Sequence, residues 1–278
     1  MKIISKLIVL LSLTIVTKVT ANQENFRVVS AEELNWGYLN PARGDKGPSA
    51  ADLWGDRTKD MPAGILLKFP KRFSSPPHVH NISYRGIVID GELHNDDPSA
   101  ANMWLPTGSY WTQPAGEVHI TAANDKQSVA FIEINTGPYL VKSPQNAFDN
   151  GERPFNMHTK NSVWSDIVAK ESMTKTGVKI TYLWGSLEEG EFRGALLKFP
   201  PGVSAALSSK ANTLHAVLIK GKIAYQTQSS LKALKPGSYF GSNGLHAHQL
   251  SFNDDDESLI YVRSDGEFDI ILNPNLYQ

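Results

Sequence analysis

The stretch Gly-Ile-Leu-Leu-Lys-Phe-Pro at residues 64–70 decides the fold, because it recurs as Gly-Ala-Leu-Leu-Lys-Phe-Pro at residues 194–200. Six of the seven residues are identical, at a shift of 130 positions. A period of this length is that of a whole domain, and two copies are too few for a solenoid. The sequence therefore predicts a tandem duplication. Further matches are Leu53–Gly55 with Leu183–Gly185 at the same shift, and Gly108–Tyr110 with Gly237–Tyr239 at a shift of 129.

Each copy consists of short apolar runs separated by Gly, Pro, Asn or Asp. The runs are rich in Ile, Val, Leu, Phe and Tyr, which favour strands, and their spacing of roughly 8–12 residues is typical of a sandwich or barrel. Helical turns are expected only at Ala31–Leu34 and Asp166–Glu171. The pattern predicts an all-β fold of antiparallel strands. The clearest runs are Gly64–Phe69, Gly86–Asp90, Ser128–Ile134, Gly194–Phe199, Ala216–Lys220 and Ser258–Arg263.

The duplication also predicts the domain boundaries. We place the first barrel at residues 22–141 and the second at residues 159–278. Residues 142–158 are polar and contain proline, so we interpret them as a linker that is ordered against one barrel or free.

The N-terminal segment, residues 1–21, has the pattern of a secretory signal peptide. Lys2 and Lys6 precede the apolar run Leu7–Val16, and Val19–Ala21 is a small-x-small cleavage site. The run is shorter than the about 20 apolar residues that a spanning helix needs. An amphipathic first helix is the alternative interpretation. We expect a periplasmic or secreted protein with no membrane attachment after cleavage.

The composition restricts the partners and the kinds of site that this chain can have. The 278 residues include 27 basic and 28 acidic side chains and no cysteine. Nucleic acid and anionic lipid bind clustered basic charge, which this balance does not provide. Without cysteine there is no thiolate nucleophile, iron–sulfur cluster or cysteine-ligated zinc. Any metal must therefore be held by His, Asp, Glu or Tyr.

Three histidines of the first copy form a candidate metal site. His78 and His80 are two residues apart, so in a strand both side chains point to the same face. A third, His119, follows the turn-forming Pro114-Ala115-Gly116. Two imidazoles on one face and a third from a neighbouring strand can converge on one ion.

These residues follow two motifs of the cupin superfamily, which the sequence resembles. The first motif, HxH with a Glu or Gln and then a Gly, corresponds to His78, His80, Tyr84 and Gly91, and the second is met at every fixed position by Gly108, Pro114, Gly116 and His119. More specifically, the chain resembles a secreted two-cupin family of unknown function related to the ChrR-type cupins. The resemblance implies two jelly-roll (double-stranded β-helix) barrels in tandem and one divalent transition metal, Fe, Zn or Mn, on His78, His80 and His119.

One position departs from the cupin pattern, because Tyr84 stands where a carboxylate or amide is usual. A phenol ligates only if the metal drives its deprotonation, so Tyr84 is expected to donate a hydrogen bond or line the pocket rather than to ligate. With a spacing longer by one residue the position falls on Arg85, whose guanidinium cannot ligate. We therefore expect a three-His site with open positions, with Glu117 as a general base and His94 as a weaker pocket candidate.

The second copy lacks most of this site. We expect a structural partner barrel, although His215, His246 and His248 leave open a rebuilt cluster. At the shift of 130, His78, His80 and Tyr84 correspond to Ser208, Lys210 and Leu214, and at the shift of 129 His119 corresponds to His248.

Two classes of function are compatible with this sequence. The leading hypothesis is a metal-dependent enzyme, of dioxygenase type by analogy with other three-His cupins, that acts on a small organic molecule. The alternative is a non-catalytic module that binds a metal or small ligand for sensing. A storage protein would leave the three histidines without a purpose. A homodimer is compatible with either class.

Overall fold

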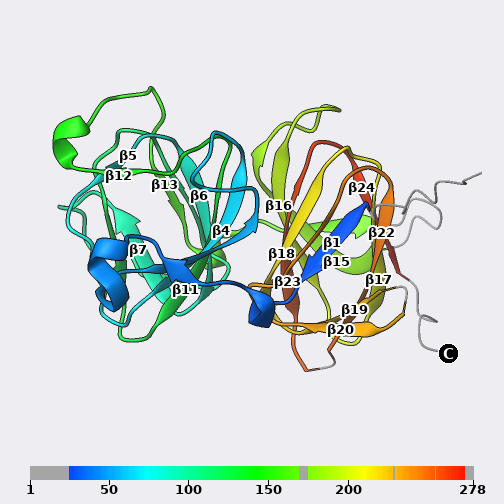
Figure 1. The fold of residues 1–278 in the computed structure, drawn as a ribbon. Helices are drawn as coiled ribbons and strands as arrows, with labels where there is room; N and C mark the ends of the chain where they lie inside the picture. Colours follow the sequence, from blue (N-terminus) through cyan, green and yellow to red (C-terminus); the bar gives the residue numbers. More distant parts are fainter. Residues whose placement is uncertain (1–24, 169–174, 228, 254, 273–278) are drawn as a thin grey trace, which may run out of the picture.

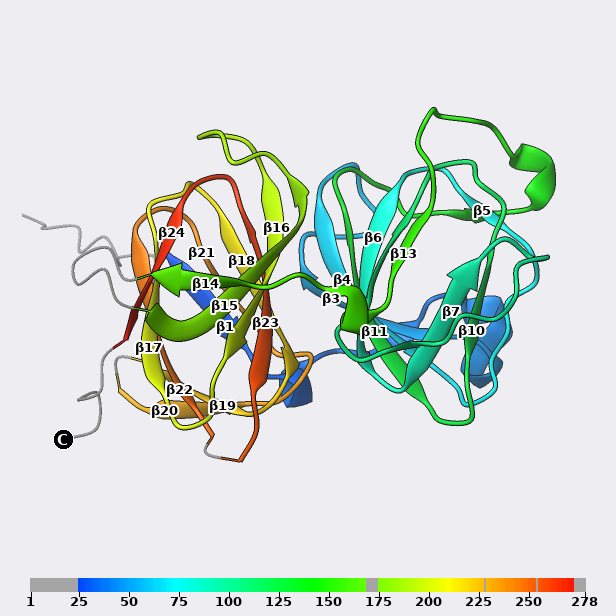
Figure 2. The same ribbon diagram turned by 180° about the vertical axis from the view of Figure 1, so that it is seen from behind.

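The chain folds into two β barrels that lie side by side (Figures 1 and 2). The structure is a computed structural model and describes residues 25–168, 175–227, 229–253 and 255–272. The predicted signal peptide lies outside these residues. The helices within the described ranges are 3-10 turns, and none of them is long and apolar enough to cross a membrane.

The first barrel is built on a seven-stranded antiparallel sheet with the order β13-β9-β6-β11-β4-β3-β2. A three-stranded sheet, β10-β7-β8, and the short pair β12-β5 complete it. The bounds are β2 (Gly37–Tyr38), β3 (Ser49–Trp54), β4 (Ala63–Phe69), β5 (Val79–His80), β6 (Tyr84–Asp90), β7 (Glu92–Asp96), β8 (Leu105–Pro106), β9 (Tyr110–Gln113), β10 (Ile120–Ala123), β11 (Ser128–Ile134), β12 (Val141–Lys142) and β13 (Phe155–Met157).

The second barrel repeats this plan with a seven-stranded sheet, β1-β21-β18-β23-β16-β15-β14, and a five-stranded sheet, β20-β19-β22-β17-β24. The bounds are β1 (Phe26–Val29), β14 (Ser165–Val168), β15 (Lys175–Gly185), β16 (Arg193–Phe199), β17 (Ser204–Ser209), β18 (Leu214–Lys220), β19 (Ile223–Gln226), β20 (Leu231–Leu234), β21 (Tyr239–Ser242), β22 (His246–Phe252), β23 (Ser258–Ser264) and β24 (Phe268–Leu272).

The two large sheets pack against each other, which explains why their central strands are apolar on both faces. In β4, Ile65 and Leu67 point into the first barrel, whereas Leu66 points outward into a second core. That outer core is shared, because it also contains Leu196 and Val217 of the second barrel. Strands that are buried on both faces form continuous apolar runs instead of alternating ones.

A buried charge cluster lies in the same interface. The carboxylate of Glu133 accepts a hydrogen bond of 2.7 Å from Tyr261 and lies 3.6 Å from the guanidinium of Arg263. Glu133 and Arg263 are only 1% and 3% exposed. Buried charges are stable only when they are paired and hydrogen-bonded, so these contacts help to fix how the two barrels meet.

Two segments cross between the predicted domains. Strand β1 lies in the range expected for the first barrel but pairs with β21 of the second, where Phe26 and Val28 pack on the core. Its apolar side chains thereby cover an edge of that sheet. Residues 142–158 include β13, which pairs with β9, so part of the predicted linker is ordered against the first barrel.

The predicted fold class, two tandem all-β cupin-type barrels, is confirmed. Each of the six apolar runs lies within a strand, and a 3-10 turn at Ala31–Glu33, capped by Ser30, is found where a helical turn was expected. The predicted turn at Asp166–Glu171 is wrong for its first part, because Asp166 lies in β14 and pairs with Lys179 of β15. The rest of it lies outside the described residues. The remaining 3-10 turns are Pro41–Lys46, Pro144–Asn146 and Thr159–Asn161.

Candidate metal centre

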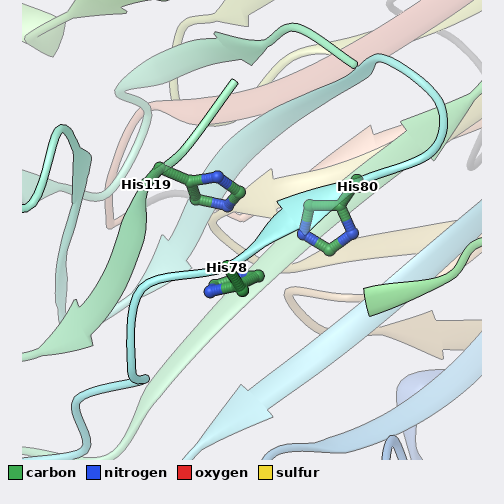
Figure 3. Close-up of side chains that lie close together, drawn as sticks. All are labelled: His78, His80 and His119. Carbon is green, nitrogen blue, oxygen red and sulfur yellow. The ribbon is translucent and has the colours of Figure 1, made fainter. Parts of the chain in front are cut away.

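Two chain segments bring the three histidines together inside the first barrel. His78 and His119 form an isolated antiparallel bridge, with reciprocal backbone hydrogen bonds of 3.0 Å, and His80 is the last residue of β5. The alternation of an extended chain puts His78 and His80 on one face. Figure 3 shows the three side chains close together, His78 and His80 from one segment and His119 from another. Their ligand atoms all lie within 4.8 Å of one another, so one ion can reach all three.

Backbone carbonyls fix the tautomer of each ring. Because a carbonyl oxygen only accepts, the Nδ1 atom that faces it must carry the proton, and the Nε2 atom keeps its lone pair. The three rings are thus prepared as Nε2 ligands, in the way that metal-binding histidines are usually held. Nδ1 donates to the backbone carbonyl of Pro76 at 2.9 Å in His78, of Leu140 at 3.1 Å in His80 and of Glu117 at 3.2 Å in His119.

Burial keeps these imidazoles neutral. It lowers the pKa of His78, it lowers the pKa of His80 well below the usual range, and it lowers the pKa of His119 to about 3, while the neighbouring histidines add to the effect on His80 and His119. A neutral imidazole has a free lone pair at neutral pH. The donor set therefore fits a divalent transition metal, because imidazole suits ions such as zinc and iron.

Two phenols lie beside the histidines. The hydroxyl of Tyr84 donates to Oδ1 of Asn95 at 3.1 Å and lies 3.5 Å from Nε2 of His119. The hydroxyl of Tyr139 lies 3.2 Å from Nε2 of His80, to which it donates. Burial raises the pKa of both phenols above their ordinary value, so they stay protonated. The structure thus places Tyr84 against the cluster as a hydrogen-bond donor.

A buried amide network supports Tyr84, and sequence reasoning did not find it. Asn95 accepts from Thr121 at 2.7 Å and donates to Gln113 at 2.8 Å, and Gln113 in turn donates to the backbone carbonyl of Glu117. The period of two along β7 could have indicated that Leu93 and Asn95 share the inward face. No pattern in the sequence indicated Gln113 or Tyr139.

Two of the predicted pocket residues lie elsewhere. His94 is buried on the opposite face of β7 from Asn95, with its ring 6.1 Å from that of Trp104, so its predicted place in the pocket is wrong. Glu117 contacts His119 and Gln113 through its backbone carbonyl. Its carboxylate is not among the described groups that line the cavity, and its role as a general base stays a prediction.

A cavity of about 150 Å³ opens beside the cluster. His78, His80, Tyr84 and Tyr139 form its polar side. The other walls are mostly apolar. They consist of Leu39, Pro48, Leu67, Phe69, Phe73, Pro76, Trp111, Ile132 and Val141, with Asn40, Arg43, Ser75 and Thr121 as the further polar residues.

The second barrel does not keep the ligand set of the first. Leu207 is the bridge partner of His248, as His78 is of His119, so the true equivalents of His78 and His80 are Leu207 and Ser209, one residue before those predicted. Lys210 follows β17 and is exposed, which corrects the expectation of an ammonium at the ion position. Leu207 and the neighbouring apolar side chains fill the centre as a core.

The remaining histidines of the second barrel do not rebuild a site. His248 is fully buried between Tyr225 at 2.8 Å and Ser242 at 3.1 Å. His246 lies near it, but His215 stacks on Trp54 across the barrel interface. Within the described ranges, the group formed by His78, His80 and His119 is the one set of His and acidic side chains close enough to hold an ion.

The chain was compared with known protein families and proteins. A family model described as a domain of unknown function, DUF4437, matches residues 27–271. A search of curated protein sequences gave no match.

Several solved structures are similar to the chain. A candidate dioxygenase from Nostoc punctiforme is 13% identical, with a TM-score of 0.65 over 90% of this chain and 87% of that one. An oxalate decarboxylase from Lactobacillus farciminis is 10% identical, with a TM-score of 0.55 over 88% of both chains. Vicilin from hazelnut, Corylus avellana, is 10% identical, with a TM-score of 0.55 over 88% and 87%. At such identities the likeness shows the fold alone, a pair of cupin-type β barrels.

Proposed function

This chain belongs to the DUF4437 family, and since that name carries no activity, we propose a function from the site itself: a metal-dependent enzyme of dioxygenase type that acts on a small organic molecule. The observation that carries the proposal is the grouping of three imidazoles, each of which offers a ring nitrogen within 4.8 Å of the others. In each ring Nδ1 faces a backbone carbonyl, which leaves Nε2 as the atom that can ligate.

His78, His80 and His119 would hold one divalent transition metal, with iron, zinc and manganese as candidates. Such an ion supplies Lewis acidity and, if it is iron, the ability to activate O₂. An ion held by three protein ligands would keep coordination positions for a substrate, as a catalytic site requires and a closed structural site does not.

The residues around the ligands have defined tasks. Tyr84 and Tyr139 each place a protonated hydroxyl beside an Nε2 atom. The hydroxyl of Tyr84 already donates to Asn95, whereas that of Tyr139 would be free to donate to a substrate oxygen once an ion occupied Nε2 of His80. Asn95 holds the hydroxyl of Tyr84. The apolar walls exclude water and orient the body of the substrate.

Elemental analysis tests the metal assignment. We expect about one transition metal per chain in the purified protein, and its loss in His119→Ala, because removal of one of three neutral ligands leaves two. His248→Gln is the matched control, since that histidine lies outside the site. Purified wild-type protein that neither retains nor takes up a transition metal would refute the site.

Oxygen uptake tests the reaction class. The iron-loaded protein should consume O₂ when a substrate from a panel of small diketones, thiols and phenolics is added, and His119→Ala should not. One observation favours the alternative, a non-catalytic binding module: within the part of the chain that the structure describes, no carboxylate lines the cavity to act as a base. Tightly held zinc without turnover of any panel member would support that module.

We also propose that the protein is exported to the periplasm or secreted. The support is the basic, apolar and small-x-small pattern of residues 1–21. Mass spectrometry of the protein recovered after export should show a chain that begins at Asn22, whereas an intact Met1 in the cytoplasmic fraction would contradict export.

A further inference from the structure

The cavity beside the histidines has an unbalanced charge. Arg43 is the one ionised side chain among its lining residues, and no Asp or Glu of the described chain contributes to that lining. In the same part of the chain, no carboxylate forms an ion pair with the Arg43 guanidinium. Arg43 is an exposed residue at the edge of this cavity, and its guanidinium carries five N–H donors that can bind an anion.

A capped turn holds Arg43 at the edge of the cavity. It belongs to the 3-10 segment Pro41–Lys46, which connects β2 and β3, and Asn40 caps the segment by accepting from the backbone of Ala42 at 3.0 Å. Gly44 has a φ of +53°, a conformation that favours glycine. A Cβ at Gly47 would lie 3.1 Å from that of Arg43, so the base of the arginine packs closely on the chain.

The size and walls of the cavity restrict the body of a ligand. A cavity of about 150 Å³ with walls of leucine, isoleucine and aromatic residues can take a molecule such as benzene. Because Leu67, Phe69 and Ile132 offer no hydrogen bonds, they favour an apolar ring or a short branched chain.

We infer that the site takes a small monocarboxylate whose apolar body is about the size of a benzene ring. The carboxylate pairs with Arg43, and the apolar body lies between the apolar walls, beside His78, His80 and the two phenols that line the same cavity. The inference rests on the proposed function for the role of the histidines. A divalent ion held by the three neutral imidazoles would add further positive charge, which a bound anion would offset.

Calorimetric titrations with benzoate and with benzamide, its neutral near-isostere, test this inference. We expect wild-type protein to bind benzoate at least about tenfold more tightly than benzamide, which is the range for a charge-assisted hydrogen bond. Arg43→Gln should lose this preference, and Arg43→Lys should retain part of it. Lys46→Gln removes an exposed cation from the same turn and should bind benzoate as wild type does.

Each titration is made with metal-free and with zinc-loaded protein, and the zinc content is measured on the same sample. Equal affinity for the two probes, a preference that survives in Arg43→Gln, or binding of neither probe would overturn the inference. Absence of zinc in a protein that still prefers benzoate would overturn the proposed metal centre instead. A melting temperature of Arg43→Gln close to that of wild type shows that its fold is intact.

Discussion

His248 should make the stability of the second barrel depend on pH, and the dependence can be worked out from its surroundings. The side chain is fully buried, and burial, with a contribution from His246, lowers its pKa to about 3 from the 6.5 expected in an unfolded chain. As the pH falls below about 6.5, the unfolded chain takes up a proton that the folded chain does not. The free energy of unfolding therefore decreases as the pH is lowered from about 6.5, until the pH reaches the pKa of His248 in the folded protein.

The magnitude follows from these two pKa values. In the middle of the interval the slope is about 1.4 kcal/mol per pH unit for one proton. Between about pH 6 and about pH 4, His248 alone should lower the free energy of unfolding by about 2.5 kcal/mol. In His248→Gln this contribution disappears, while the amide can still bond to Tyr225 and Ser242.

The assay is urea unfolding of metal-free wild type and His248→Gln at a series of pH values. In the plot of the free energy of unfolding against pH, the slope of the variant should be smaller by the contribution of one proton. A constant difference in stability at neutral pH does not affect this slope. Tyr225→Phe is the matched control, because it removes a hydrogen-bond partner of His248 but leaves the imidazole, so its curve should be displaced and parallel. Equal slopes for wild type and His248→Gln would refute the reasoning.

Three further predictions concern the site and the interface. Asn95→Ala should weaken zinc binding by about 10- to 100-fold in chelator competition, because the amide orients Tyr84 and Gln113 beside the histidines. Unchanged zinc affinity would contradict this. Zinc at about a thousand times its Kd should stabilise the protein by about 4 kcal/mol, or roughly 8–16 °C in Tm, and His119→Ala should abolish the shift seen by calorimetry. Glu133→Gln should lower the free energy of unfolding by about 3 kcal/mol in urea, because Arg263 stays buried without its counter-charge, and a loss below about 1 kcal/mol would argue against that role.

Much of the fold and the ligand set could be predicted because the decisive signals are local. The repeated stretch at residues 64–70 implies two equal domains, and the alternation of side chains in a strand puts His78 and His80 on one face. The order and spacing of the second motif place His119 on the neighbouring segment. Such signals depend on what one strand or one turn does, and a strand behaves in much the same way in any barrel.

The rest of the site depended on contacts between residues far apart in the chain. Tyr139 reaches His80 from a segment 59 positions away, and Asn95 joins Tyr84 to Gln113 from three different strands. Nothing in the spacing of these residues indicates that they meet. The place of Arg43 could not be predicted either. Its charge can act on a ligand only because the turn between β2 and β3 folds against the cavity.

The register of the second barrel is a further feature that the sequence did not predict and strand pairing decided. The shift of 130 predicted Ser208 and Lys210 at the lost ligand positions, whereas the pairing of Leu207 with His248 moves both by one residue. A one-residue slip exchanges the two faces of a strand, so only the pairing could decide which side chains face inward.

The sequence by itself therefore determined the all-β class and the three histidines, since each follows from local periodicity or from a motif within one half of the chain. Only the tertiary structure decided which barrel β1 joins, which groups surround the histidines and what fills the second barrel. These depend on how separate strands pair and on which apolar faces they bury together, and that information lies in the packing of the whole chain rather than in any one segment of it.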